Sequence, residues 1–157
     1  MNERWSRQSF LGPDSEKVLV NATIGVVGLC GGGSHIVQQA AHVGIGHLVC
    51  ADCDHVDMSN TNRMVGSRPD DAEEKVLKTA VTERTIRLIN PNANVMSVAR
   101  KWYSEELLFR DCTAIFGCVD SFTARDELER FCRRYLIPYI DVGMDVHADR
   151  VCGALGS

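Results

Sequence analysis

The stretch Ile24-Gly-Val-Val-Gly28-Leu-Cys-Gly31-Gly-Gly33-Ser34 decides the fold of this chain. It reads as a short apolar strand, a glycine-rich turn and the start of a helix, and a second apolar strand follows at 47–51. Glycines let the backbone turn tightly and approach a phosphate or ribose closely. The pattern therefore predicts a βαβ unit that holds a nucleotide, with Gly28, Gly31 and Gly33 in the binding turn.

The residues around this turn support the same interpretation. A helix expected over 34–43 points its free N–H groups and its positive dipole end at the turn, and Gly44 is suited to end it. Asp52 lies about twenty residues beyond the glycines, where such folds place an acid on a ribose hydroxyl. Asp54 belongs to the same acidic tip and is assigned to the same site.

Strand-like and helix-like segments alternate along the whole chain. We expect helices over 14–20, 71–88, 104–109 and 122–135, and strands over 23–27, 47–51, 93–99, 113–117 and 138–142. This alternation predicts an α/β fold: a Rossmann-like, doubly wound, mainly parallel sheet with helices on both faces. Ligands bind at the carboxyl ends of such strands, so the Gly28 turn, Asp52 and Asp120 should converge.

Length and composition narrow the function classes. The 157 residues suit one domain, 1–157, in which 1–12 form a polar arm. The net charge of −4, without a basic run interleaved with aromatics, argues against nucleic-acid binding. Apolar runs are strand-sized and the N-terminus lacks a secretory core, so we expect no membrane span and a cytoplasmic location.

The seven cysteines sit mostly in apolar, strand-like contexts. Without a secretory signal a disulfide framework is not expected. Cys50 and Cys53 form a Cys-x-x-Cys, but no second pair completes a zinc site. We interpret the cysteines as small buried hydrophobic residues, with metal or redox chemistry as the alternative.

Five short motifs together resemble the ThiF/MoeB/HesA adenylyltransferase family, which is similar to the adenylation domains of ubiquitin-activating enzymes. The motifs are Arg4-Trp-Ser-Arg7-Gln8, Val27-Gly-Leu-Cys-Gly-Gly-Gly-Ser34, Ala51-Asp-Cys-Asp-His-Val-Asp-Met-Ser-Asn-Thr-Asn-Arg63, Lys78 ahead of Asn90-Pro91, and Cys118-Val-Asp120-Ser-Phe-Thr-Ala-Arg125. They occur in the family's order and approximate spacing, and they cover nearly all of residues 4–145.

The resemblance implies that the protein binds ATP and Mg2+. It would activate the C-terminal carboxylate of a ubiquitin-like or sulfur-carrier protein as an acyl adenylate. Arg63 and Lys78 would neutralise the triphosphate, Asn60 would orient the phosphates and Asp120 would hold the magnesium. In the family a second arginine of the N-terminal motif reaches the neighbouring subunit's ATP, which implies a homodimer and gives that role to Arg7.

The sequence also departs from the family pattern. Cys30 replaces a glycine of the loop, which would hinder backbone approach there, and Lys75 competes with Lys78 for the phosphate-binding role. The resemblance implies further strands beyond residue 145, so we expect this chain to be a fragment or a shortened form that lacks the C-terminal portion of the family fold. The alternative function is therefore a truncated or non-catalytic module that binds nucleotide or a partner without turnover. A nicotinamide-dependent dehydrogenase is a third candidate, supported only by the glycine turn and Asp52.

Overall fold

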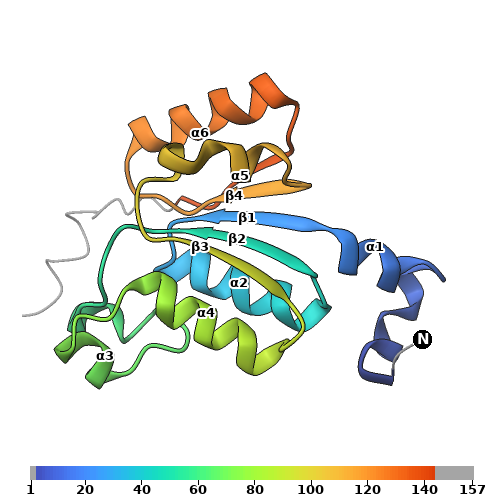
Figure 1. Cartoon of the computed structure of the whole chain (residues 1–157), viewed down its shortest axis with the longest axis horizontal. Coiled ribbons are helices and arrows are strands. Elements are labelled where there is room, and N and C mark those ends of the chain that lie inside the picture. The colour runs from blue at the N-terminus through green and yellow to red at the C-terminus, as the bar shows by residue number, and fades with distance from the viewer. Residues whose placement is uncertain (1–2, 144–157) are drawn as a thin grey trace, which may run out of the picture.

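The computed structural model describes residues 3–143, apart from the side chains of Arg4, Trp5 and Arg7. Its centre is a five-stranded sheet in the order β3-β2-β1-β4-β5, and all neighbouring strands are parallel (Figure 1). The strands are β1 (Thr23–Val27), β2 (His47–Ala51), β3 (Asn94–Val98), β4 (Ala114–Gly117) and β5 (Tyr139–Asp141). The order reverses between β1 and β4, as in doubly wound nucleotide-binding folds. The predicted Rossmann-like class is confirmed.

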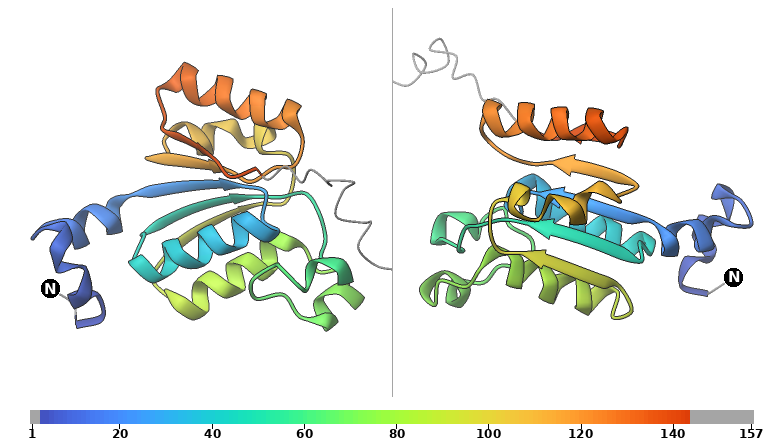
Figure 2. Two further views of the ribbon diagram at one scale, coloured as in Figure 1. Left: turned by 180° about the vertical axis from the view of Figure 1, so that it is seen from behind. Right: turned by 45° about the horizontal axis from the view of Figure 1, so that its top comes forward.

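Helices cover both faces of this sheet. α2 (Gly31–Val43) and α4 (Lys78–Ile89) lie on one face, and α5 (Glu106–Arg110) and α6 (Phe122–Tyr135) lie on the other, as Figure 2 also shows. The remaining short helices are η1 (Glu3–Leu11), α1 (Ser15–Asn21), η2 (Met58–Asn60), α3 (Pro69–Glu73) and η3 (Trp102–Glu105). Across residues 3–143, no helix combines the length and the apolar character that a membrane span requires.

Each face of the sheet has its own hydrophobic core, because successive strand residues point to opposite faces. Leu48 packs on the α2 and α4 side with Ile86, whereas its neighbour Val49 packs on the other side with Phe109 and Leu128. All five side chains are fully buried. Burying an aliphatic or aromatic side chain of this size contributes roughly 1.5–3 kcal/mol, so both cores hold the strand ends in a fixed register.

That register aligns the carboxyl ends of the strands. Val27 pairs with both Ala51 and Gly117, Ala51 also pairs with Val98, and Gly117 also pairs with Asp141. The turns that follow β1, β2 and β4 therefore open at one edge of the sheet. This edge is where the sequence predicted the site.

The predicted helix over Asp71–Leu88 is wrong. α3 ends at Glu73, and the next helix, α4, begins only at Lys78. Between them Lys75 adopts a left-handed backbone, with φ of 53°, and Leu77 forms an antiparallel bridge with His55. Val76 packs against a cluster with Val56 at its centre, so tertiary contacts outweigh the helical periodicity of this stretch.

The N-terminal arm has more order than the sequence predicted. Residues Glu3–Leu11 form the 3-10 helix η1, which leads through Gly12 into α1. Figure 1 shows η1 and α1 at the end of the sheet where β1 begins, projecting from the α/β body. The arm thus lies at the opposite end from the turn after β1.

Candidate nucleotide-binding site

The turn between β1 and α2 is built around two glycines that no other residue could replace without movement. Gly28 has φ of +88°, and a Cβ added there would lie 2.4 Å from the carbonyl oxygen of Cys118. A Cβ on Gly33 would lie 1.8 Å from the carbonyl oxygen of Gly28. The turn after β1 is therefore packed directly against itself and against the turn after β4.

Gly31 has a different environment. It is the first residue of α2, so the predicted start of this helix at Ser34 is three residues late. A Cβ on Gly31 would meet only the Arg63 side chain, at 3.6 Å from Cδ. Amides in the first turn of a helix have no intrahelical acceptor, and they carry the positive end of the dipole. Gly31 thus leaves a space between these N–H groups and Arg63.

Cys30, which the sequence predicts to hinder backbone approach to a ligand, is the N-cap residue of α2. Its φ of −82° and ψ of −129° lie outside both the helical and the extended regions. Its half-buried side chain packs against the small cluster formed by Val56, Met64, Ala72 and Val81. The Cβ at position 30 is accommodated by the fold.

Asp52 connects the tip of β2 to the glycine turn. Its Oδ2 accepts a hydrogen bond from the amide of Leu29 at 2.8 Å, and its Oδ1 accepts one from the amide of Asp54 at 2.9 Å. A carboxylate has about four lone-pair positions, so both oxygens can still accept from a ribose hydroxyl. Asp52 shapes the turn and remains available to a ligand.

Lys78 places a nearly buried ammonium beside this acidic tip. The residue is 8% exposed, and its Nζ lies 2.9 Å from Oδ2 of Asp54. Burial lowers the pKa of Lys78, but the hydrogen bond from its ammonium to Asp54 and the charge of Asp52 outweigh burial and raise it above its usual value. The same hydrogen bond lowers the pKa of Asp54. Lys78 is therefore a fixed positive charge next to the turn.

The competing lysine points elsewhere. The Nζ of Lys75 pairs with Asp57, and both of these side chains are more than half exposed. Lys78, by contrast, is close enough to Asp52 for the charge of that carboxylate to act on it. The geometry favours Lys78 as the lysine of the site.

Asn60 and Arg63 lie on the segment that follows the acidic tip. Asn60 is buried, and its Oδ1 accepts from the amide of Asp57 at 3.0 Å, so its side chain shapes η2. The exposed Arg63 donates from Nη1 to the carbonyl of Ser59 and to Oδ1 of Asn62. Its aliphatic part lies against Gly31, as described above. Arg63 can thus reach a ligand, whereas Asn60 acts through its own loop.

Asp120 follows β4 at the same edge of the sheet, and its side chain is exposed. The helix cap beside it is Ser121, whose Oγ accepts from the amide of Ala124 at 3.2 Å. Within residues 3–143, no hydrogen bond or ion pair engages the Asp120 carboxylate. Free carboxylate oxygens suit Mg2+, which prefers oxygen ligands.

Ser34 is a site residue that sequence reasoning did not single out. Its hydroxyl donates to the carbonyl of Gly31 and accepts from the amide of Val65, both at 3.0 Å. It therefore ties the segment that carries Arg63 to the first turn of α2. The only local signal is a serine in a glycine-rich helix start, which by itself does not indicate such a contact.

The side-chain ligand atoms of Asp52, Cys53 and Asp54 lie within 4.8 Å of one another. Asp54 is already paired with Lys78, and Asp52 accepts two backbone amides. We therefore assign no metal to this group. Three of the other cysteines, Cys50, Cys112 and Cys132, are buried as expected, and burial raises the pKa of each thiol, to about 12, 12 and 11.

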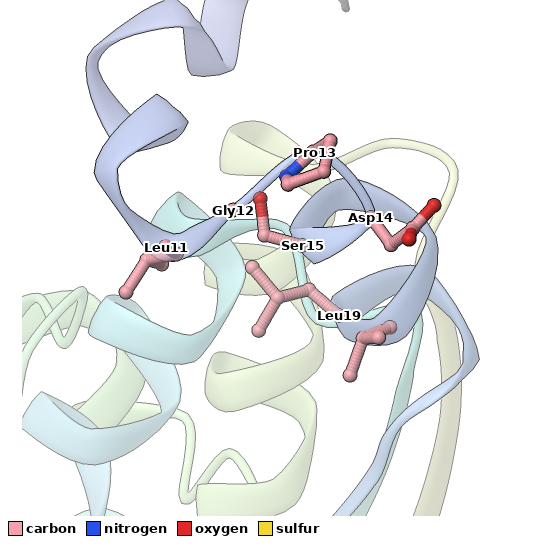
Figure 3. Close-up of a pocket in the computed structure, with 7 residues that line it drawn as sticks. Leu11, Gly12, Pro13, Asp14, Ser15 and Leu19 are labelled. Carbon is pink, nitrogen blue, oxygen red and sulfur yellow. The ribbon is translucent and has the colours of Figure 1, made fainter.

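A shallow pocket of about 400 Å³ lies away from this edge of the sheet, between η1 and α1 (Figure 3). Leu11, Gly12, Pro13, Asp14, Ser15, Val18 and Leu19 line it. Its lining is mainly apolar, with one carboxylate and no cation, so it is unsuited to phosphate. The predicted Arg7 belongs to this arm, and its side chain lies outside the described residues.

Comparison with known proteins supports the fold. The ThiS adenylyltransferase of Bacillus subtilis is 30% identical over 130 residues, which cover 80% of this chain and 39% of that protein. A tRNA threonylcarbamoyladenosine dehydratase of Haemophilus influenzae is 31% identical over 135 residues, covering 83% and 51%. The chain spans about half the length of the curated relatives it matches or less.

A solved structure of the tRNA N6-threonylcarbamoyladenosine dehydratase of E. coli in complex with ATP superposes with a TM-score of 0.80 at 28% identity. The match covers 88% of this chain and 58% of that one. A model of the ThiF family matches residues 4–148. Because this model matches most of its length, the chain belongs to the ThiF family.

Proposed function

We propose that this domain binds ATP at the nucleotide site and transfers AMP to a carboxylate. By nucleotide site we mean the turn at Gly28–Gly33 with Asp52, Arg63, Lys78 and Asp120. A carboxylate oxygen would attack the α-phosphorus while the bond to the bridging oxygen breaks, so that an acyl adenylate forms and pyrophosphate leaves with the electron pair. Such a reaction needs alignment and positive charge more than a covalent catalyst.

The observation that carries this proposal is the pair of cations around the first turn of α2. Lys78 lies beside the acidic tip with its ammonium nearly buried, and Arg63 lies against Gly31. A triphosphate entering between them would meet both charges and the free amides of α2. A nicotinamide dinucleotide has only two phosphates and transfers a hydride at its nicotinamide ring, so its chemistry needs no cations at the phosphates beyond binding.

The residues also fit the nucleoside and the metal. Asp52 would accept from the ribose hydroxyls with the lone pairs that the Leu29 and Asp54 amides leave open. Asp120 would hold Mg2+, which when bound supplies positive charge to the phosphates. Asn60, the buried last residue of η2, would keep Arg63 in place, since its carbonyl accepts from the Arg63 amide at 3.0 Å.

The carboxylate is proposed to be the C-terminus of a ubiquitin-like or sulfur-carrier protein. The names of several relatives support this choice, among them the ThiS adenylyltransferase of Bacillus subtilis and the molybdopterin-synthase adenylyltransferase of Haemophilus influenzae. The C-terminal carboxylate of such a partner carries one negative charge, and Arg63 is an exposed cation at the same edge.

The arm at 3–21 supports the proposed homodimer. Phe10 is 81% exposed and Leu11 and Val18 are also exposed, so the arm carries an apolar surface that the α/β body leaves uncovered. We propose that a second copy covers it and brings Arg7 towards the neighbouring site. Sedimentation of the full chain tests this, and a monomer at 100 μM or so, well above typical Kd values for dimers, would contradict it.

Calorimetric titration of ATP with Mg2+ is the experiment that tests the site. We expect binding that depends on Mg2+ and that is lost, or weakened at least about tenfold, in Asp120→Ala; about tenfold corresponds to 1.4 kcal/mol. NAD is the control ligand and should not compete. Failure of the wild-type chain to bind ATP refutes the proposal.

Carboxylate-dependent exchange of labelled pyrophosphate into ATP then tests turnover. Exchange with a carrier protein that ends in a free carboxylate supports the adenylyltransferase. ATP binding without exchange, over a panel of such carriers, would instead support a module that binds nucleotide without turnover.

A further inference from the structure

An ion pair between the buried Asp71 and the partly exposed Arg84 joins α3 to α4. Asp71 is 5% exposed and receives both terminal nitrogens of Arg84, Nη1 at 2.9 Å on Oδ1 and Nη2 at 2.7 Å on Oδ2. The amide of Arg68 donates to the same carboxylate at 2.8 Å. Three hydrogen bonds to one buried carboxylate fix its geometry tightly.

Arg84 holds the preceding turn as well. Its Nη2 also donates to the carbonyl oxygen of Gly66 at 2.9 Å. Gly66 has φ of +80°, and a Cβ there would lie 2.1 Å from Oγ1 of Thr85, so this turn sits directly on α4. We call the contacts of Arg84 with Asp71 and Gly66 the clamp.

The clamp connects the two parts of the chain that carry Arg63 and Lys78. Arg63 precedes Gly66 by three residues, and Lys78 opens the helix that carries Arg84. The two cations of the site therefore belong to different elements, joined by a connection of short helices and turns. The clamp ties the Arg63 side of that connection to the helix of Lys78.

Stability alone does not explain why the clamp uses a charged pair, Asp71 and Arg84. Replacing a buried ion pair by apolar residues of similar volume is often neutral or stabilising. An apolar pair, however, could not bond the amide of Arg68 or the carbonyl of Gly66, so it would not define the path of this segment. Directional hydrogen bonds fix the positions of backbone groups.

We infer that Asp71 and Arg84 are positioning residues for the triphosphate, because the clamp fixes Arg63 relative to Lys78. The inference rests on the proposed ATP site. It concerns the β- and γ-phosphates, which two cations must hold together. The nucleoside and α-phosphate, at Asp52 and the Gly28 turn, do not depend on the clamp. Loss of the clamp should therefore weaken ATP binding and leave AMP binding nearly unchanged.

The test uses Arg84→Lys, which keeps the charge but loses the planar fork, and Asp71→Asn, which keeps the volume. Arg87→Lys is the matched control, since Arg87 makes a two-nitrogen contact with Glu83 one turn further along α4, away from the connection. ATP and AMP affinities are measured by calorimetry at a temperature where circular dichroism shows each variant folded. Arg84→Lys carries the test if Asp71→Asn does not fold.

We expect the ratio of ATP affinity to AMP affinity to fall about tenfold or more in Arg84→Lys, which corresponds to about 1.4 kcal/mol. In Arg87→Lys the ratio should stay within about twofold of the wild-type ratio. A general loss of structure would lower both affinities together. An unchanged ratio in folded Arg84→Lys overturns the inference.

Hydrogen exchange of residues 61–68 without nucleotide separates this inference from the proposed function. Faster exchange there in Arg84→Lys, but not in Arg87→Lys, shows that the clamp holds the Arg63 segment; equal exchange overturns the clamp even if ATP binds. If the wild-type chain binds no ATP, the proposed function fails and the inference falls with it, whatever the exchange shows.

Discussion

Two neighbouring glycines in the first turn of α2 should respond in opposite ways to the same substitution. Gly31→Ala and Gly33→Ala each add one methyl group to the same turn. The space around the two positions differs, because Gly33 faces a backbone oxygen and Gly31 faces a flexible side chain. Comparing the two variants therefore distinguishes a glycine that the fold requires from a glycine that ligand binding requires.

For Gly33→Ala we expect a large loss of stability. The new Cβ would lie 1.8 Å from the Gly28 carbonyl oxygen, so two backbone segments would have to separate by about 1 Å to reach the shortest contact that real Cβ atoms make. Overpacking typically costs about 1–3 kcal/mol, and a rigid backbone partner favours the upper end. At about 2–4 °C per kcal/mol for a domain of this size, Tm should fall by about 6–12 °C.

For Gly31→Ala we expect a small gain in stability with a loss of binding. The nearest atom, Cδ of Arg63, would lie at an ordinary contact distance of 3.6 Å. Replacing a glycine in a compatible conformation stabilises by about 0.4–1 kcal/mol, which raises Tm by about 1–4 °C. The methyl group, however, occupies the space between the α2 amides and Arg63. A phosphate placed there should bind about tenfold more weakly, or about 1.4 kcal/mol.

Thermal unfolding by circular dichroism and calorimetric titration of ATP measure the two effects on the same samples. If Gly31→Ala binds ATP as tightly as the wild-type chain, the phosphate does not lie between Gly31 and Arg63. If Gly33→Ala is as stable as the wild type, the contact with the Gly28 carbonyl is not as close as the structure shows.

Three further predictions test individual side chains. Lys78→Met should weaken ATP binding more than about tenfold, which corresponds to about 1.4 kcal/mol, whereas Lys75→Met should leave the affinity within about twofold. If calorimetry gives the reverse order, Lys75 is the phosphate ligand. The hydrogen bond from Arg84 lowers the pKa of Asp71 below its usual 3.8. The stability that Asp71 contributes is therefore fully present above pH 3.8, and it is lost as the pH falls through the lower pKa that Asp71 has in the folded protein. In urea unfolding, the free energy of unfolding should therefore fall more steeply with decreasing pH in the wild type than in Asp71→Asn. The same pH dependence in both proteins would contradict the ion pair. Cys30→Gly should lower the free energy of unfolding by about 1–2 kcal/mol through lost packing and added chain entropy, with ATP affinity unchanged; a large affinity gain would mean that the thiol does obstruct the turn.

The sheet and its main helices could be predicted because their signals are local. β1, β2 and α6 occupy the expected residues, 23–27, 47–51 and 122–135. Apolar runs bounded by glycine, proline and aspartate give both the type and the limits of such elements. Parallel order then brings the Gly28 turn, Asp52 and Asp120 to one edge.

The connection from 61 to 77 could not be predicted, because distant contacts decide its path. Leu77 leaves the helical pattern to bridge His55, and Lys75 takes up a left-handed backbone that its sequence does not favour. The amide of Val65 finds its partner in the hydroxyl of Ser34, far back in the chain. Only the folded structure defines such pairs, and helical periodicity alone predicts one long helix instead.

The contacts of the site residues also divide their roles in a way that the motif does not. Asp52 and Asn60 each accept hydrogen bonds from backbone amides, and these contacts define the turns that they bridge. Arg63 and Lys78 are both cations: the aliphatic part of Arg63 lies against Gly31, and the ammonium of Lys78 pairs with Asp54 at the acidic tip. Substituting either acceptor should therefore disturb folding and binding together, since an unpaired amide would remain inside the turn. Substituting either cation should change binding far more than stability. The sequence motif does not distinguish these residues from one another. The hydrogen bonds do, because they separate the groups that build the site from the groups that can face a triphosphate.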